Sequence, residues 1–260
     1  MYVSKLVLNW LLKFNSLTSR KAVPYGAAFF LAPSMTLDQK ISLYQTFCNV
    51  LTAERRQKFE QIWEQRNTCL HLVLENIYQS LNASAIVRTA DALGVHYLHV
   101  LEDEHPWEIN RKISKGAMDW LDIQRSKNAR EMMLSLKSKG FELAVTDFSP
   151  NAIAIEDYEP QRPVALVMGT ELTGISDVAR ELADVQLIIP MSGFSQSLNV
   201  SVATGIAVAQ LSRKTMKLKE QFPPSIEERY DALNLWSKNA IYWSDQIIKD
   251  FVVENQINSI

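Results

Sequence analysis

The chain has 260 residues, 47% hydrophobic and 22% charged, with a net charge of −2, which is ordinary for a globular protein with a sizeable core. No apolar run approaches the roughly 18 residues that a membrane span requires. Cys48 and Cys69, with four scattered histidines, argue against a zinc site or a disulfide scaffold. We therefore expect a cytoplasmic protein with no membrane partner and no metal.

Basic residues are unevenly distributed along the chain. Residues 1–37 carry four bases and no acid, whereas the rest holds the other 23 bases against 29 acids. Within that acidic part, bases cluster at residues 55–58 and 213–219, where either a phosphate site or a solvated helix face explains them. Residues 1–36 read as a transit peptide, a poor secretory signal or sequence upstream of a start at Met35, and we expect them to be poorly ordered.

From residue 37 the pattern becomes regular. Residues 37–67 lack Gly and Pro and predict one or two helices. Apolar runs predict strands at residues 70–74, 95–101, 141–148, 164–168 and 185–189. Helices are predicted at residues 82–93, 129–139, 176–182 and 199–218, with one or two more at 225–252. This alternation predicts an α/β fold with a parallel sheet and helices on both faces.

The first polar motif is Asn82-Ala-Ser-Ala-Ile-Val-Arg88, at the start of the helix predicted over residues 82–93. Asn82 is a favourable N-cap residue. Arg88 lies about 200° around the helix from Ile86, off the apolar stripe, where it can grip a phosphate with two hydrogen bonds. A simple cap at Asn82 and a surface pair between Arg88 and Asp91 explain the segment at least as well.

The second motif, Gly169-Thr-Glu171-Leu-Thr-Gly174, follows the strand predicted over residues 164–168. A glycine there lets backbone approach a ligand, although a plain strand-to-helix turn explains the motif roughly as well. The motif is not a dinucleotide-binding pattern, because a carboxylate stands where backbone would meet pyrophosphate. Glu171 is better suited to a ligand without phosphates, such as S-adenosylmethionine with its cationic sulfonium.

The third motif covers residues 189–203 and reads Ile-Pro-Met-Ser-Gly-Phe-Ser-Gln-Ser-Leu-Asn-Val-Ser-Val-Ala. A simple turn would not need so long a loop between a strand and a helix. Several backbone donors gather where the helix begins, near Ser197 to Asn199. The pattern predicts a ligand-binding loop.

In order and spacing, the three motifs resemble the signature motifs of the SpoU branch of the knotted (SPOUT) RNA 2′-O-ribose methyltransferases, and within it the TrmH type that modifies tRNA. The resemblance runs from about residue 52 to residue 213, and the third motif is the most specific. It implies an α/β domain with a C-terminal trefoil knot that holds S-adenosylmethionine, and a homodimer with the active site near the subunit boundary. Its division of the chain is an extension at 1–36, a helical segment at 37–68, the methyltransferase domain at 69–218 and a helical extension at 219–260.

The resemblance also implies roles for single residues. Arg88 matches the catalytic arginine of the family, and Asn82 matches an asparagine of its first motif. The polar groups that shape the site and the dimer contact match Glu171, Ser197 and Asn199. Donor-binding positions carry over to Thr146, Gly169, Ile189 and Leu198. On the basic flanks we expect RNA phosphate contacts from Arg55, Lys58, Arg66, Arg213 and Lys214.

In the family mechanism, Arg88 and an RNA phosphate activate the ribose 2′-hydroxyl, and positioning supplies much of the rate. No histidine stands in the three motifs, which argues against a histidine base, and the sulfonium is an activated leaving group that needs no metal. The sequence departs from TrmH-like relatives before Asn82, where Tyr78-Gln-Ser-Leu81 replaces a frequent Lys-Pro-His. That departure bears on the choice of RNA substrate.

Short helices on both flanks are the TrmH arrangement and favour tRNA, with a guanosine of the D loop as the expected target. A ribosomal-RNA 2′-O-methyltransferase of the same family is the alternative. An RNA-binding protein without catalysis ranks lower, because Arg88 and the donor loop are both present. A nicotinamide oxidoreductase lacks its phosphate-binding glycines.

Overall fold

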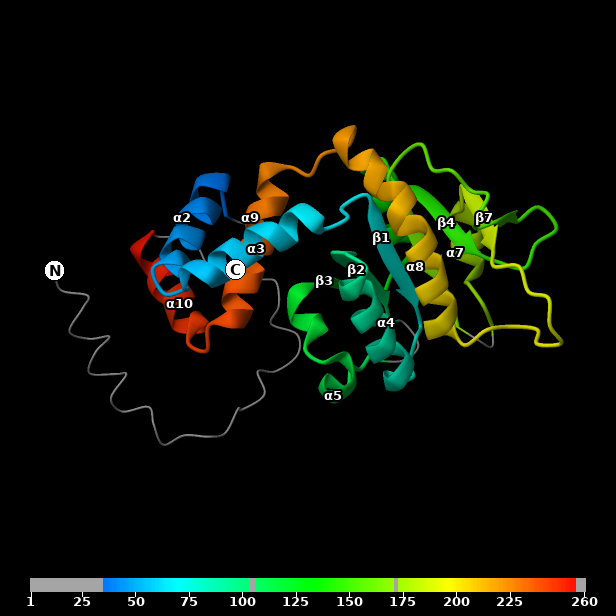
Figure 1. Cartoon of the computed structure of the whole chain (residues 1–260), viewed down its shortest axis with the longest axis horizontal. Helices are drawn as coiled ribbons and strands as arrows, with labels where there is room; N and C mark the ends of the chain where they lie inside the picture. Colours follow the sequence, from blue (N-terminus) through cyan, green and yellow to red (C-terminus); the bar gives the residue numbers. More distant parts are fainter. Residues whose placement is uncertain (1–34, 103–105, 171–172, 256–260) are drawn as a thin grey trace.

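The computed structural model describes residues 35–102, 106–170 and 173–255 (Figure 1). The expectation of poor order in residues 1–36 thus falls outside the described residues, except at Met35 and Thr36. Figure 1 shows a cluster of helices on the left and an α/β part on the right, joined by the chain between α3 and β1 and by the segment between α8 and α9.

A parallel sheet forms the centre of the α/β part. Over the described residues it has seven strands in the order β3-β2-β1-β6-β4-β7-β5, and every pair is parallel. The strands are β1 Leu70–Glu75, β2 Tyr97–Leu101, β3 Asp122–Ser126, β4 Glu142–Thr146, β5 Ile153–Ala154, β6 Val164–Met168 and β7 Val185–Ile188. The central β1 and β6 are buried along their whole length, as strands covered on both faces must be.

Helices cover both faces of this sheet. Those of the α/β part are α4 Ser80–Ala92, α5 Arg111–Ser114, α6 Ala129–Ser138, α7 Asp177–Leu182 and α8 Val200–Met216, with 3₁₀ turns η1 Ala117–Trp120 and η2 Lys217–Glu220. Ile86 of α4 and Leu211 of α8 are buried in one core cluster, on one face. Met133 of α6 and Ala179 of α7 are buried in a second cluster, on the other face. The predicted parallel sheet with helices on both faces is confirmed; the trefoil knot stays a prediction.

The predicted strands are all present, with ends that differ by at most two residues, but two edge strands escaped prediction. β3 reads Asp-Ile-Gln-Arg-Ser and is half exposed, so it carries no apolar run. β5 has two residues, too few for any periodicity. Among the described residues, no helix is long and apolar enough to cross a membrane.

The first and last described helices pack together in two buried clusters. They are α2 Leu37–Cys48, α3 Ala53–Gln65, α9 Ile226–Ala240 and α10 Ser244–Glu254. Trp63 of α3 packs in the same cluster as Leu233 and Trp236 of α9. Lys40 of α2, 5% exposed at its side chain, pairs with Glu227 at 2.7 Å and Asp231 at 2.9 Å on α9. The two ends of the sequence therefore build one helical cluster beside the sheet.

A buried arginine lies where this helical cluster meets the α/β part. Arg66, directly after α3, pairs with Asp91 of α4 through a 2.6 Å Nη2–Oδ1 contact. Its guanidinium also donates to the backbone carbonyls of Val95 and Trp120, each at 3.1 Å. Trp236 of α9 donates from Nε1 to the same Trp120 carbonyl at 2.9 Å. The Trp120 carbonyl, at the end of η1, thus accepts hydrogen bonds both from Arg66, after α3, and from Trp236 of α9.

Candidate active site

A cavity of about 400 Å³ opens at the carboxyl ends of β4, β6 and β7. This edge is where open α/β sheets bind ligands. The residues after those strands line it, together with the loop before α8. The four residues predicted to bind the donor all line this cavity: Thr146, Gly169, Ile189 and Leu198. Ser197, predicted to shape the site, lines it as well.

Gly169 sits where the chain folds back on itself. Thr170 and Gly174 form an antiparallel bridge with two N–H···O bonds of 3.0 Å. A Cβ on Gly169 would stand 2.1 Å from the carbonyl oxygen of Gly174 and 2.4 Å from the nitrogen of Ile175. The glycine is therefore required by the turn of the chain itself, and not only by a ligand as the sequence suggested.

The charges around this cavity suit a ligand without phosphates. Arg180 lines it and donates from Nε to Asp147 Oδ2 at 2.8 Å. That hydrogen bond holds the pKa of Asp147 below its ordinary value. Among the lining residues that the structure describes, the arginine is thus already paired, and no lysine or histidine stands beside it. A pyrophosphate would find no free cation, whereas an uncharged or cationic nucleoside fits.

The start of α4 differs from the prediction. The helix begins at Ser80 with Gln79 as N-cap, so Asn82 is its third residue and the predicted cap at Asn82 is wrong. Asn82 donates from Nδ2 to Gln79 Oε1 at 3.0 Å instead. Its Oδ1 accepts a 3.0 Å hydrogen bond from Nδ2 of Asn199. Asn199 is the N-cap of α8, with Oδ1 accepting from the backbone nitrogen of Ser201 at 3.0 Å. The first and third motifs are therefore in direct contact.

Arg88 projects from α4 to the outside. It is exposed, while Ile86 and Ala90 on the same helix are buried at 0% and 1%. The surface pair between Arg88 and Asp91 does not form, because Asp91 is held by Arg66. Within the described residues, Arg88 makes neither an ion pair nor a hydrogen bond. Its guanidinium remains available to a ligand, as the predicted role requires. Glu171, the remaining predicted polar residue of the site, lies outside the described residues.

The sequence reading missed a buried carboxylate next to this site. Glu75 ends β1, is 2% exposed, and accepts hydrogen bonds from Ser176 N at 2.9 Å and Ser176 Oγ at 2.8 Å. Ser176 also caps α7, accepting from the backbone nitrogen of Ala179 at 3.1 Å. Glu75 thus anchors the end of the turn that begins at Gly169. The sequence signal for this residue was an acid at the end of a mostly apolar strand.

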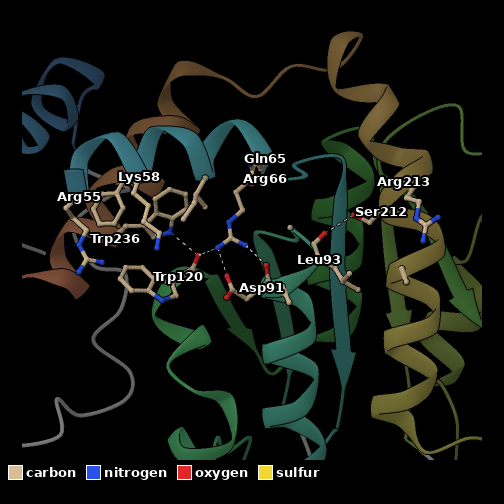
Figure 2. A pocket seen from close by; sticks show the side chains of 15 residues that line it. Arg55, Lys58, Gln65, Arg66, Asp91, Leu93, Trp120, Ser212, Arg213 and Trp236 are labelled. Atoms are coloured by element: carbon tan, nitrogen blue, oxygen red, sulfur yellow. Dashed lines mark hydrogen bonds and ion pairs between the residues drawn. The ribbon is translucent and has the colours of Figure 1, made fainter. Parts of the chain in front are cut away.

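The predicted phosphate-binding residues separate into two groups. Arg55, Lys58 and Arg213 are exposed and line a second cavity, between α3, α4 and α8 (Figure 2). The prediction for Arg66 is wrong, because its guanidinium is 3% exposed and bonded inside the protein. Lys214 is held internally too, donating from Nζ to the carbonyl of Tyr158 at 2.8 Å.

The parallel sheet covered by helices and the cavity at its carboxyl edge define a ligand-binding protein of the α/β class. The profile of the SpoU rRNA Methylase family matches residues 69–209, and the chain belongs to that family. The tRNA (guanosine(18)-2′-O)-methyltransferase of Borreliella burgdorferi is 34% identical over 210 residues, which cover 80% of this chain and 93% of that protein.

Solved structures of SpoU enzymes are similar to this fold. The TrmH/SpoU tRNA modifying enzyme of A. aeolicus aligns with a TM-score of 0.58 and 31% identity, covering 79% of this chain and 98% of that one. The SpoU methyltransferase AviRb of Streptomyces viridochromogenes, solved with AdoMet, aligns with a TM-score of 0.51 and 25% identity, over 56% of this chain and 60% of that one.

Proposed function

We propose that this protein transfers the methyl group of S-adenosylmethionine to the 2′-hydroxyl of a guanosine in the D loop of tRNA. The observation that carries the proposal is the contact of Asn82 with Asn199, which brings the helix bearing Arg88 against the loop that closes the donor cavity. Support for tRNA comes from the Borreliella burgdorferi relative, which acts on tRNA and matches over 93% of its length.

The cavity at the carboxyl edge would hold the donor. Gly169, Ile189 and Leu198 offer backbone and apolar surface, and Thr146 closes the end of β4. When bound there, S-adenosylmethionine supplies a methyl group on a sulfonium leaving group. Paired Arg180 places no free positive charge against that cation. Glu171, beyond the described residues, keeps its proposed place as a carboxylate of the site, and so does Ser197 as a polar group of the cavity wall.

Arg88 would act on the RNA. Its guanidinium binds the phosphate beside the target ribose and stabilises the negative charge that develops on the attacking 2′-oxygen. Arg88 and the RNA phosphate would together activate the 2′-hydroxyl, which loses its proton as its oxygen bonds the methyl carbon and the C–S bond of the donor breaks. Such a charge in the transition state lowers the barrier by about 3–4 kcal/mol. Positioning of the ribose against the donor supplies the rest.

We also propose a homodimer. Three large apolar side chains are exposed near the Asn82–Asn199 contact: Leu81 at 64% on α4, and Val202 at 51% and Ile206 at 36% on α8. A patch of this kind marks an interface, and closed two-fold dimers are the commonest assembly. Light scattering should give twice the mass of the chain. We place the enzyme in the cytoplasm, where the free Cys48 and Cys69 stay reduced.

The test compares Arg88→Ala with the wild type in single-turnover methylation of tRNA, with melting curves and calorimetry of S-adenosylhomocysteine. We expect a loss of about 10²–10³ in rate at unchanged stability and donor affinity, with poor rescue by Arg88→Lys. Arg162→Ala, an exposed arginine outside both cavities, is the control and should keep full activity. Retained activity with a lower melting point would give Arg88 a structural role. Nucleoside mass spectrometry that finds the methyl group in ribosomal RNA would overturn tRNA as substrate.

A further inference from the structure

The second cavity, of about 630 Å³, has no part in the methyl transfer described above. It lies between the helical cluster and the α/β part, against α3, the end of α4 and the second half of α8 (Figure 2). Arg55 and Lys58 reach it from α3, and Arg213 from α8. Its volume is large enough for a nucleotide.

The electrostatic character of this cavity is positive. Asp91 is the acid among the described lining residues, and the buried Arg66 neutralises it through a 2.6 Å ion pair. Arg55, Lys58 and Arg213 form no ion pair with any residue that the structure describes. Three unneutralised cations around one cavity attract an anion. They also disfavour the cationic methyl donor, so the two cavities select ligands of opposite charge.

The walls between these cations suit a flat group. Trp120 presents a partly exposed indole, and Leu93, 37% exposed, lines the cavity on the other side of Asp91 (Figure 2). The Gln65 amide, for which the described residues provide no hydrogen-bond partner, offers a donor and an acceptor on the same wall. An aromatic surface beside a cation is how proteins hold an unstacked nucleobase with its phosphate.

We propose that this cavity seats one nucleotide of the RNA substrate, away from the target ribose. The base lies against Trp120 and its phosphate near Arg55 and Lys58, while Arg213, at the other end of the cavity, adds positive charge (Figure 2). This inference rests on the proposed function for its substrate. Continuity with the active site supports it, because Ala92 lines the cavity and follows Arg88 on the same face of α4, about 6 Å along the axis. An RNA strand that reaches Arg88 therefore passes the mouth of the cavity.

The first test compares two charge reversals on α3. Lys58→Glu places a carboxylate in the cavity, and Arg56→Glu makes the same change of charge next to it, on a residue outside the lining. We expect Lys58→Glu to raise the KM for tRNA about tenfold more than Arg56→Glu, with S-adenosylhomocysteine affinity unchanged in both. Equal effects of the two variants would reduce the cavity to a diffuse basic surface and overturn the proposal.

The second test fills the cavity without touching its charges. Leu93→Trp should weaken tRNA binding while light scattering still gives the wild-type mass. Loss of the dimer together with activity would instead make a second copy of the chain the occupant. Unchanged tRNA binding would also contradict the proposal.

Calorimetry of the wild type with 5′-GMP and with guanosine separates this inference from the proposed function, since it needs no methylation. Binding of 5′-GMP that Lys58→Glu abolishes, and weaker binding of guanosine, are expected. If no RNA is methylated but 5′-GMP binds, the proposed function fails and the nucleotide site stands. If tRNA is methylated and 5′-GMP does not bind the wild type, the nucleotide site fails alone.

Discussion

Asn199 donates a 3.0 Å hydrogen bond from Nδ2 to Oδ1 of Asn82, across 117 positions of sequence. The same Asn199 caps α8, and Asn82 lies in the first turn of α4. The loop that lines the donor cavity is therefore tied to the helix that carries Arg88. This contact therefore joins the element that would bind the methyl donor to the element that would bind the RNA phosphate.

Replacing Asn199 with Ala should remove both the cap and the contact. We expect a loss of stability of about 1 kcal/mol from the cap. Because the loop before α8 also loses its tie to α4, the affinity for S-adenosylhomocysteine should fall as well. Ser225→Ala is the matched control, since Ser225 caps α9 with a 3.1 Å bond from the Glu228 nitrogen, far from the cavity. Thermal melts and calorimetry of both variants check this, and equal donor affinity in the two would contradict it.

Gly169→Ala should abolish donor binding. The added Cβ would lie 2.1 Å from the Gly174 carbonyl oxygen, a backbone atom that cannot rotate away, so the turn must move off the cavity. Gly205→Ala serves as control. Gly205 lies inside α8, and a Cβ there would lie 3.6 Å from the methyl group of Thr89 on α4, an ordinary van der Waals distance. Alanine there should stabilise the helix by about 0.5–1 kcal/mol. Calorimetry that finds wild-type donor affinity in Gly169→Ala would show that the turn tolerates a side chain.

The central strands could be predicted from the sequence because they are buried on both faces: β6 is a continuous apolar run, and β1 is apolar apart from His71 and its last residue, Glu75. Such an apolar pattern is a local property of the sequence and can be read from it directly. The family resemblance then implied donor-binding roles for four residues that all line one cavity: Thr146, Gly169, Ile189 and Leu198. The edge strand β3 escaped because half of its residues face water.

Long-range partners were beyond prediction from the sequence. In the sequence, Arg66 is one basic residue among several. No neighbouring residue indicates that its guanidinium pairs with Asp91 and donates hydrogen bonds to the carbonyls of Val95 and Trp120. Asn82 is of a residue type favoured at helix N-caps, yet α4 starts two residues earlier, at Ser80. The side-chain oxygen of Asn82 instead accepts a hydrogen bond from Asn199. Burial and tertiary hydrogen bonds decide the role of such residues, whereas residue type and spacing set only what is possible.

Arg66→Ala should destabilise the protein strongly. It leaves the Asp91 carboxylate, 27% exposed, without its cation and removes the arginine donor from the Val95 carbonyl, whereas the Trp120 carbonyl keeps its hydrogen bond from Trp236. Breaking such a buried pair costs about 3–5 kcal/mol. Arg55→Ala, an exposed arginine on the neighbouring helix, should change stability by less than about 0.5 kcal/mol. Urea unfolding measures both, and similar midpoints for the two variants would restore Arg66 to the RNA-binding residues.

Stability should fall as the pH drops from 7 toward 4.5. Burial lowers the pKa of His99 to about 4 and that of His96 to about 3, and it lowers the pKa of His71 well below its ordinary value. Below the ordinary histidine pKa of about 6.5, the unfolded chain takes up protons that the folded chain refuses, so the folded state loses free energy as the pH falls. Asp122 acts in the opposite direction, because burial raises its pKa to about 6. Three histidines outweigh one carboxyl, and we expect a net loss of about 5 kcal/mol between pH 7 and 4.5.

The variant His99→Gln isolates the cause of this pH dependence. His99 Nε2 lies 3.0 Å from Nδ1 of His71. His71 is on β1 and His99 is on the adjacent β2, and both side chains are buried. Glutamine keeps a polar partner for His71 but cannot be protonated, so the change in unfolding free energy between pH 7 and 4.5 should shrink. The difference between the two pH values is the readout, because the substitution also alters packing at every pH. Urea unfolding at both values decides it: an unchanged difference would place the acid sensitivity in groups other than this pair.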